Sequence, residues 1–410
     1  MGLYCGIDWA SAHHDVAVVD DDGRIVVRGR VGNDAAGFAQ LLTLLAEAGD
    51  SADDPIPVAI ETDRGLWVAA LRETGRAIYP INPLAASRYR DRYAVSGAKS
   101  DATDAVLLAN ILRTDRAAHR PLPADTELAQ VIRVLARAQQ DAVWARQQIG
   151  NQIRDLLKDF YPAAIVAFAE LPSGGLARAD ARTILAAAPT PAQAATLTPA
   201  RLRRLLAKAG RRRDLDRDVA RLREVFTDTY LHQPPQVETA MGIQLAALLR
   251  QFDAAATAAD ELAEAAITHF ERHPDAQIIV SFPGLGNLAG ARVLAEIGDD
   301  RARFADARGL KAFAGSAPIT RASGKKTVVL HRHIKNHRLA AVGSIWALSS
   351  LRSSPGARRH FDTRRAAGDW NRQAQRHLFN KFLGQLHHCL HTGQPYNEHL
   401  AFPPPLPRAA

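Results

Sequence analysis

The chain of 410 residues carries a formal net charge of +9, with 52 Lys and Arg against 43 Asp and Glu. The length allows two or three domains, and the charge suits a polyanionic partner such as nucleic acid without being specific for one. The two cysteines, Cys5 and Cys389, exclude a disulfide framework and indicate a reduced, intracellular protein. No secretory signal is recognisable, and no apolar stretch is long enough to span a bilayer.

Residues 1–120 alternate predicted strands and helices. Asp-Asp-Gly at 21–23 is typical of a hairpin turn, and Asn33 or Asp34 is positioned to cap the first helix. The predicted order is strands at 3–8, 14–20 and 24–31, a helix, a strand at 57–61, a helix at 65–75 and a strand at 77–82. This is the order of an RNase H-like fold, so we expect an α/β domain with a mixed sheet covered by helices.

Residues 121–273 form an all-α middle region. The segment 127–160 has no proline and one glycine, which predicts a helix on the order of 50 Å long. A second long helix is predicted from Val237 to Arg272, with an a/d seam of Met241, Leu245, Leu248, Phe252, Ala255, Ala259, Leu262 and Ala266. Seam spacing does not identify the partner. An intramolecular helical hairpin and a coiled coil between subunits are equally compatible with it.

The segment between these two helices is dense in arginine. Its cluster comprises Arg201, Arg203, Arg204, Arg211, Arg212 and Arg213. A solvated helix face is the simplest interpretation. The clustering of one sign of charge favours a surface that contacts nucleic-acid phosphates at least as strongly.

Residues 274–400 form the third predicted domain, which is mostly helical. Pro-Gly-Leu-Gly at 283–286 lies between an apolar run and a predicted helix, and it resembles a helix-hairpin-helix turn. In such a turn Gly284 and Gly286 let backbone amides approach a phosphate, although a plain turn would also fit. The Pro-rich residues 401–410 predict a disordered tail.

Four carboxylates are expected to converge in the first domain. Asp8 ends the first strand and Glu61 ends the fourth, which are neighbours in an RNase H-like sheet, while Asp101 and Asp104 share one face at the start of a helix. Unpaired, these groups would repel one another, whereas Mg²⁺ or Mn²⁺ ions would neutralise them. Two such ions roughly 3.5–4 Å apart can stabilise the attacking and leaving oxygens of a phosphodiester exchange.

Each acid also has a simpler explanation. Asp101 could have no role beyond capping its helix, and Glu61 could simply be a charged residue at the end of a strand. Asp15, Asp63 and Glu73 are nearby competitors, and the side of the sheet on which Asp15 lies is open.

The acids and their surroundings resemble the DEDD transposases of bacterial insertion sequences, whose N-terminal domain is RuvC-like. The resemblance rests on GIDWASAHHDVAVVD, AIETDRGLW and AKSDATDAVLLA in the first domain. It also rests on FPGLGNLAGARVLAEIGD and RFADARGLKAFAGSAPITRASGKK, which look like the second domain of these proteins. Two independent motif sets in the right order identify the chain as a member of the insertion-sequence one-ten family of bridge-RNA-guided recombinases.

The resemblance implies a hybrid mechanism in which the acids bind Mg²⁺ and a serine of the second domain forms a covalent phosphoserine link to DNA. Carried over onto this sequence, that serine is Ser323. Gly324 permits close backbone approach, and Lys325 and Lys326 favour a phosphate. Ser316 ranks second, because it stands where the family usually has an apolar residue.

The basic stretch after the serine departs from the family pattern, since it lacks the usual Lys-x-Gly-Asn step. It still forms a basic patch of His331, Arg332, His333, Lys335, His337 and Arg338, in which Arg332, Lys335 and Arg338 are candidate nucleic-acid contacts.

Together these features predict a transposase that excises and inserts its own element in the bacterial cytoplasm, near the nucleoid. Serine exchange conserves phosphodiester energy, so no nucleotide cofactor is expected. The resemblance implies donor and target DNA, a structured noncoding guide RNA and a homo-oligomer from dimer to tetramer, with no membrane partner. The alternatives are a RuvC-type junction nuclease that uses water and a non-catalytic helix-hairpin-helix DNA-binding protein.

Overall fold

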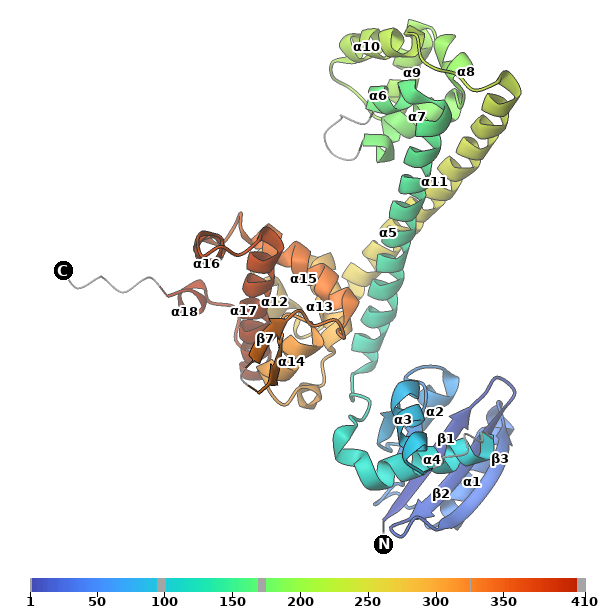
Figure 1. The fold of residues 1–410 in the computed structure, drawn as a ribbon, viewed down its shortest axis with the longest axis vertical. Coiled ribbons are helices and arrows are strands. Elements are labelled where there is room, and N and C mark those ends of the chain that lie inside the picture. The colour runs from blue at the N-terminus through green and yellow to red at the C-terminus, as the bar shows by residue number, and fades with distance from the viewer. Residues whose placement is uncertain (1, 94–100, 169–174, 325, 404–410) are drawn as a thin grey trace, which may run out of the picture. The chain divides into compact units, whose positions relative to one another are not determined.

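The computed structural model describes residues 2–93, 101–168, 175–324 and 326–403, and it divides the chain into two units between Ala124 and Asp125 (Figure 1). The two units are described separately below. The three domains expected from the sequence, with boundaries at 120 and 273, stay a prediction.

A five-stranded mixed sheet organises the first unit, which confirms the mixed α/β class. Its order is β3-β2-β1-β4-β5; β1, β2 and β3 are antiparallel neighbours, and β4 and β5 run parallel to β1. The strands are β1 (Leu3–Trp9), β2 (His13–Asp20), β3 (Ile25–Gly32), β4 (Val58–Ile60) and β5 (Ile78–Pro80). The predicted strands all occur, with ends displaced by one or two residues.

Local side-chain contacts explain how the chain turns between these elements. Asp20 accepts hydrogen bonds from the backbone amides of Asp22 and Arg24, and Gly23 has a φ of 81°, which favours glycine. Asp34, the second of the two predicted caps, accepts a hydrogen bond from the Gly37 amide and starts α1 (Ala35–Glu47).

Helices cover both faces of the sheet. Cys5 and Ile7 of β1 face a core completed by α1 and α2 (Leu66–Glu73). Ala59 of β4 faces a second core completed by α3 (Pro83–Tyr93) and α4 (Asp101–Asp115). Helix α3 is not among the elements predicted from the sequence.

Gly6 allows α4 to lie directly on β1. A Cβ atom at Gly6 would meet the Ala105 carbonyl oxygen at 2.1 Å and the Ala109 nitrogen at 2.4 Å. Backbone atoms cannot yield to a side chain, so only glycine fits here. The close approach fixes the position of α4 over the strand that carries Asp8.

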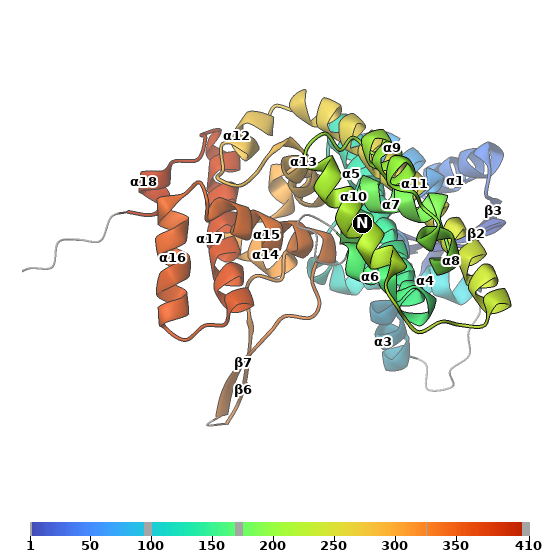
Figure 2. The same cartoon turned by 90° about the horizontal axis from the view of Figure 1, so that it is seen from above.

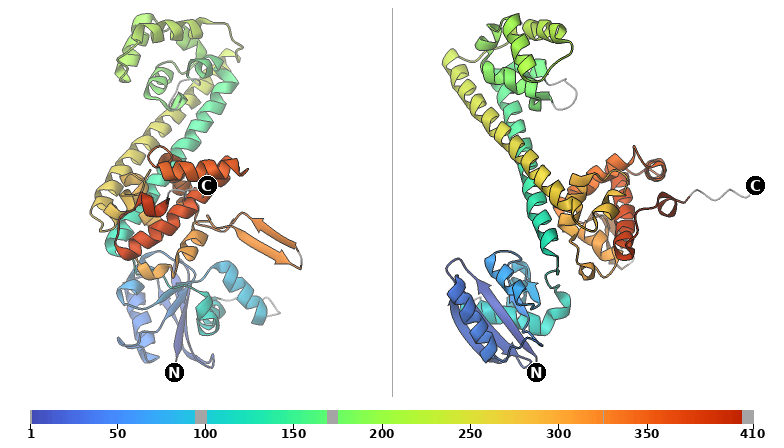
Figure 3. Two further views of the ribbon diagram at one scale, coloured as in Figure 1. Left: turned by 90° about the vertical axis from the view of Figure 1, so that its left-hand side faces the viewer. Right: turned by 180° about the vertical axis from the view of Figure 1, so that it is seen from behind.

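Two long helices form the spine of the second unit. The helices α5 (Glu127–Phe160) and α11 (Pro235–Glu271) run side by side (Figure 3). Along the predicted seam the side chains of Leu245, Phe252, Ala259 and Ala266 are buried, and those of Met241, Leu248, Ala255 and Leu262 are half-buried. The chain therefore covers part of the seam itself. A coiled coil between subunits stays a prediction.

One end of this helical pair holds a separate core of short helices. They are α6 (Pro162–Phe168), α7 (Ala179–Ala187), α8 (Pro191–Ala195), α9 (Pro199–Lys208) and α10 (Leu215–Thr227). Their apolar faces pack on the end of α5 and the start of α11, and Tyr161 is fully buried there.

A second helical core surrounds the fully buried Trp346, whose ring stacks on that of Phe382 at 5.1 Å between centroids. Its helices are α12 (Ala276–Val280), α13 (Asn287–Ile297), α14 (Ala307–Phe313), α15 (His337–Ser350), α16 (Pro355–Ala366), α17 (Asn371–Thr392) and α18 (Glu398–Ala401). Ala401 and Phe402, assigned to a disordered tail by the sequence analysis, are buried because Phe402 packs on Phe382. Residues 404–410 lie outside the described part of the chain.

A two-stranded hairpin, β6 (Ile319–Ser323) and β7 (Lys326–Leu330), projects from these helices (Figure 2). The hairpin is not among the predicted elements. Single-turn 3-10 helices occur at Arg116–Ala118, Gly175–Ala177 and Arg301–Arg303. Among the described residues, no helix combines the length and apolarity needed to cross a membrane.

Candidate active site

Asp8 and Glu61 lie at the same level on neighbouring strands. The strands β1 and β4 are parallel, and Ile7 pairs with Ile60, so the next residue of each chain segment is one of the two acids. Parallel neighbours lie about 4.8 Å apart. The register therefore brings the two carboxyl-bearing positions side by side at the carboxyl ends of the strands, as the strand order predicts.

The position of Asp8 lies on the α3 and α4 side of the sheet, and Glu61 directly follows the last residue of β4. Along β1, Cys5 and Ile7 face the opposite core, so the alternation of a strand puts Asp8 on the side of Gly6 and α4. Along β4, Ala59 faces α3 and α4, and Glu61 follows two residues later.

The direction of α4 brings its first turn toward Asp8. Near its end, Arg113 donates a hydrogen bond to the Asp21 carbonyl at 3.2 Å, in the turn after Asp20, which pairs with Leu3 at the start of β1. The middle of α4 crosses β1 at Gly6. The start of the helix, with Asp104, therefore points to the end of β1 that carries Asp8.

Asp104 is buried, with 5% of its surface exposed, and Arg90 of α3 donates a hydrogen bond to its Oδ1 at 2.5 Å. This ion pair compensates the buried charge. The side chain of Asp101 lies outside the described residues. Within the described part of the chain, no three His, Cys, Asp or Glu side chains are arranged to hold a metal ion.

Asp15, whose side was open at the level of sequence, lies directly opposite Asp8. The two residues are antiparallel partners across β1 and β2, so they share a face. Arg30 donates to both Asp15 oxygens, at 3.1 and 2.8 Å, which offsets the repulsion between two neighbouring carboxylates. Extending the strand alternation from Val16 would have predicted this placement.

His14 fixes the backbone that follows Asp8, and the sequence analysis does not identify it. Its Nδ1 accepts a hydrogen bond from the Ala10 amide at 3.3 Å, and its Nε2 lies 3.2 Å from Asn33 Oδ1. Burial lowers the pKa of His14, and the Asn33 contact opposes this shift. The ring is fully buried and links the Ala10 amide to Asn33 through these two contacts.

Ser323 lies at the tip of the β6–β7 hairpin in the second unit. It is paired with Lys326 across the turn, and its side chain is exposed. Gly324 has a φ of 56°, which favours glycine in this two-residue turn. Lys325 lies outside the described residues.

Ser316 is buried and fully engaged. Its hydroxyl donates to the Lys311 carbonyl at 3.2 Å and accepts from the Asn380 amide at 3.0 Å. These bonds tie the end of α14 to α17.

The basic residues after the hairpin that were predicted to contact nucleic acid differ in how strongly they are already engaged within the protein. Arg332 donates to the Ala317 carbonyl at 3.3 Å, whereas Lys335 contacts His331. Arg338 donates to both Asp141 oxygens at 2.7 and 2.9 Å and lies 5.0 Å from the centroid of the Trp144 ring. The charge of Arg338 is therefore committed to holding α15 against α5.

The arginine cluster of the helical middle region likewise contains both ion-paired members and members unpaired within the described part of the chain. Arg203 pairs with Asp216, and Arg211 pairs with Asp218 and lies 3.8 Å from Asp180. Arg212 and Arg213 are exposed, as are Arg201 and Arg204. Arg203 is exposed as well, whereas the other four exposed arginines form no ion pair with a described residue and have the most freedom to meet a phosphate.

Gly284 and Gly286 have different surroundings. Gly284 has a φ of 83°, and a Cβ there would meet the Ser350 nitrogen at 2.5 Å, so this glycine serves packing against the end of α15. A Cβ at Gly286 would meet nothing within 4 Å, and this residue directly precedes α13. Of the two glycines, Gly286 leaves room for a ligand.

Carboxylates at the ends of two central strands and an exposed serine in the other unit are compatible with a protein that processes phosphodiesters. A family model described as a transposase matches residues 5–162, and a second, described as the transposase IS116/IS110/IS902 family, matches residues 276–362. The first match contains all four predicted acids and the second contains Ser323.

Full-length relatives agree with these matches. A mini-circle protein named for IS117 from Streptomyces coelicolor is 60% identical over 100% of this chain and 99% of its own length. The 44.8 kDa protein of insertion element IS116 from Streptomyces clavuligerus is 30% identical over 91% of this chain and 90% of its length. The 42 kDa protein of IS900 from Mycobacterium paratuberculosis is 28% identical over 94% of each. The chain belongs to the IS110 family of transposases, enzymes that cleave and join DNA.

Proposed function

We propose that this transposase moves its element by RNA-guided DNA strand exchange through a covalent phosphoserine, with Ser323 as nucleophile and Asp8, Glu61, Asp101 and Asp104 as metal ligands. The observation that carries the proposal is the register of β1 and β4, which aligns Asp8 with Glu61 at one sheet edge. The orientation of α4 supports adding the two acids of its first turn.

We extend the proposal to the fold class of the first unit. Three antiparallel strands followed by two parallel ones, in the order β3-β2-β1-β4-β5, are compatible with an RNase H-like, RuvC-like domain. In such a domain the acids gather at the carboxyl ends of the central strands, where Asp8 and Glu61 lie.

The donor set suits a hard divalent cation, because it consists of carboxylate oxygens. Arg90 now compensates Asp104, so a cation bound there would replace the guanidinium as the partner of that carboxylate. When bound, Mg²⁺ or Mn²⁺ would stabilise negative charge on the phosphate and on its attacking and leaving oxygens.

Ser323 would supply the nucleophilic oxygen. Its Oγ attacks phosphorus, the Oγ–P bond forms, and the bond from phosphorus to a deoxyribose oxygen breaks. A serine hydroxyl needs a base, and a carboxylate of the acidic set would accept its proton and return it to the released hydroxyl. Attack by a hydroxyl of the exchanging strand then restores both the phosphodiester and the serine, so no nucleotide cofactor is consumed.

The exposed setting of Ser323 supports its delivery to an acidic set of the same or a neighbouring subunit. Such delivery would fit a dimer or tetramer. The exposed arginines Arg212 and Arg213 are suited to the backbone of a structured guide RNA or of DNA.

A covalent adduct tests the proposal. Full-length protein incubated with a guide RNA of the proposed kind, Mg²⁺ and matching DNA should yield a protein–DNA adduct that survives denaturant. Ser323→Ala should lose the adduct and recombination but keep DNA binding. Ser316→Ala should keep the adduct.

Each alternative has its own outcome. An adduct that persists in Ser323→Ala and disappears in Ser316→Ala would reassign the nucleophile. Cleavage without any adduct would support a RuvC-type nuclease that uses water. An absence of metal-dependent cleavage would leave a DNA-binding protein only.

A further inference from the structure

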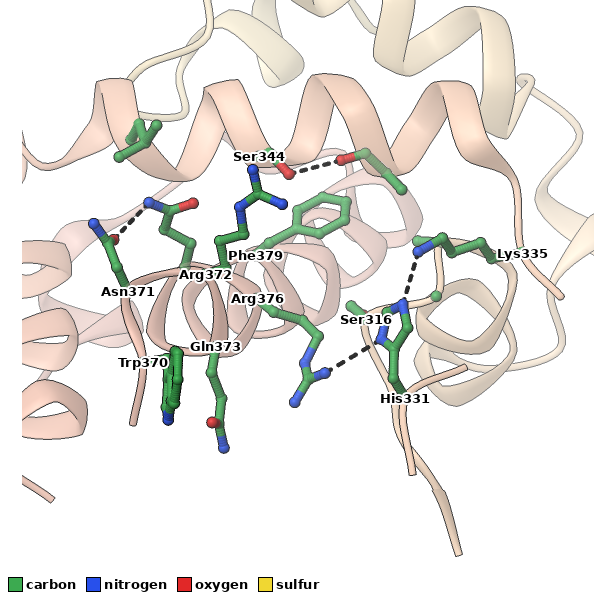
Figure 4. A pocket seen from close by; sticks show the side chains of 15 residues that line it. Ser316, His331, Lys335, Ser344, Trp370, Asn371, Arg372, Gln373, Arg376 and Phe379 are labelled. Carbon is green, nitrogen blue, oxygen red and sulfur yellow. Dashed lines mark hydrogen bonds between the residues drawn. The ribbon is translucent and has the colours of Figure 1, made fainter. Parts of the chain in front are cut away.

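A cationic cavity lies beside the base of the hairpin in the second unit. It has a volume of about 980 Å³ and lies between the segment that follows α14, one face of α15 from Ala340 to Leu348, and the first turns of α17 (Figure 4). Lys335, Arg372 and Arg376 line it, and no carboxylate is among the described residues that do. The cavity therefore has a net positive charge without a compensating side chain in its lining, which suits an anionic ligand.

Three basic side chains in this cavity, His331, Lys335 and Arg376, have more hydrogen-bond donors than acceptors among them. Lys335 Nζ lies 3.0 Å from His331 Nε2, and Arg376 NH1 lies 3.4 Å from His331 Nδ1 (Figure 4). Lys and Arg only donate, and a neutral imidazole accepts at one nitrogen. In one of the two contacts, the N–H of the imidazole therefore faces the N–H of Lys335 or Arg376, and neither group can accept. A phosphate oxygen among the three groups would accept from the excess donors.

The charge state of His331 agrees with this arrangement. Burial lowers the pKa of His331, and Lys335, Arg376 and His333 lower it further. An anion placed among these groups would reverse the electrostatic part of that shift.

Trp370 adds an aromatic surface to the rim of the cavity. It directly precedes α17, and 80% of its surface is exposed, which is unusual for a side chain of this size. Stacking between an indole ring and a base is tolerant of base identity, but it needs a base whose face is not already stacked. A neighbouring phosphate site and an exposed indole together fit a nucleotide that is not in a duplex.

We propose that this cavity binds a single-stranded segment of nucleic acid, with a backbone phosphate at His331, Lys335 and Arg376 and an unpaired base stacked on Trp370. The proposal rests on the proposed function, since it specifies which form of the nucleic-acid partner the second unit holds. The chemistry is shared by DNA and RNA, so the test separates the two.

Fluorescence anisotropy of the full-length protein with labelled dT15, rU15 and a 15-base-pair DNA duplex tests the proposal. Trp370→Ala should weaken binding of at least one single strand by about five-fold to one hundred-fold, the range seen for loss of one stacked base. Duplex binding should change by less than about two-fold, because paired bases offer no free face. A loss confined to dT15 assigns the cavity to DNA, and a loss confined to rU15 assigns it to RNA.

Two matched variants control for surface and charge effects. Leu231→Ala removes another highly exposed apolar side chain, and Arg358→Gln removes a charge from the α16 surface of the same unit. Neither should alter single-strand binding. Arg376→Gln should weaken it and reduce the slope of log affinity against log salt by about 0.7, as expected for one phosphate contact on a single strand.

A photocrosslink gives a readout that does not depend on the variants folding. With 5-bromouracil in dT15 or rU15, the parent protein should crosslink at Trp370. Unchanged single-strand binding in Trp370→Ala, or an equal loss for duplex and single strands, would overturn the proposal. These assays need no metal and no cleavage, so a failed adduct experiment with intact Trp370-dependent binding would count against the phosphoserine mechanism alone.

Discussion

The carboxylates at the ends of β1 and β4 and the serine on the β6–β7 hairpin differ in how much surrounding structure fixes them. Asp104 is 5% exposed and paired with Arg90, and Asp8 lies on a strand hydrogen-bonded on both sides. The hairpin contributes almost nothing to a core, and Val329 on β7 is 65% exposed. The acids are thus positioned by the fold itself, whereas the serine depends on what the hairpin meets.

This difference has a physical basis. A two-stranded hairpin is marginally stable in water without other packing, while a sheet covered on both faces by helices is not. Conformational freedom at the serine suits a nucleophile that has to reach a phosphate on a large substrate. Metal ligands need fixed geometry, and buried secondary structure supplies it.

Loss of one acid should give the largest effect. Asp8→Asn or Glu61→Gln should lower recombination about a thousand-fold or more, because a metal ligand supports several kcal/mol of transition-state stabilisation. Measured without divalent metal, the melting temperature of Asp8→Asn should not fall, since the change relieves repulsion with Asp15, its cross-strand neighbour. Recombination and calorimetry measure the two quantities.

The exposed Asp22, which pairs with Arg24 in the first hairpin turn, provides the control for that experiment. Asp22→Asn should leave recombination unchanged. Parent-level recombination in both acid variants would show that the sheet edge is not the metal site.

Matched glycine substitutions sharpen the comparison. Gly6→Ala should destabilise the first unit by roughly 2–3 kcal/mol, because its Cβ would overlap the backbone of α4 at 2.1 and 2.4 Å. Gly324→Ala has open space and costs only about 1–2 kcal/mol of local strain at a φ of 56°. Its effect should appear as slower adduct formation without a change in melting temperature. A drop in melting temperature from Gly324→Ala would mean that the hairpin belongs to the folded core.

Much of the first unit could be predicted from sequence, because strand alternation and cap residues are local signals. The strand order, the Asp34 cap and the side-by-side position of Asp8 and Glu61 all follow from them. Helix α3 was missed, since its sequence Pro83–Tyr93 has a weak apolar pattern. Its Arg90, which pairs with Asp104, was missed with it.

Local signals could not reveal which arginines are already paired. The contact of Arg338 with Asp141 spans 197 residues, and neither position hints at the other. The two exposed strands around Ser323 were also missed, because their residues share no buried face that would create an alternating pattern. The sequence motif located Ser323 without indicating how it is held.

The base of the hairpin should show acid-sensitive stability. Asn336, which caps α15 a few residues after β7, donates to Glu296 at 2.6 Å, and Arg137 donates to both Glu296 oxygens at 2.7 Å. Burial raises the pKa of Glu296, but Arg137 and Asn336 outweigh it and leave the pKa below its usual 4.5. This stabilisation is complete above pH 4.5 and is lost as the pH falls through the lower folded-state pKa.

Glu296→Gln should therefore lower stability at pH 7 by about 1–3 kcal/mol, at the modest end because Arg137 is 40% exposed. It should also flatten the acid limb of a denaturation series. The exposed Glu264 of α11 provides the control, and Glu264→Gln should leave the acid limb unchanged. If the stability of Glu296→Gln fell with decreasing pH in the same way as that of the parent, Glu296 would not be what stabilises the base of the hairpin.

The smallest effect is expected from the arginine cluster, where members with and without an ion-pair partner among the described residues can be compared directly. Arg212→Gln with Arg213→Gln should reduce the slope of log affinity against log salt for duplex DNA by about 1.8, if each contacts one phosphate. Arg203→Gln with Arg211→Gln should reduce it less, because Asp216 and Asp218 already compensate those charges. Binding titrations at several salt concentrations measure both slopes. Equal slopes in the parent and both double variants would leave the cluster as a solvated surface, and the nucleic-acid backbone would then have to be held elsewhere.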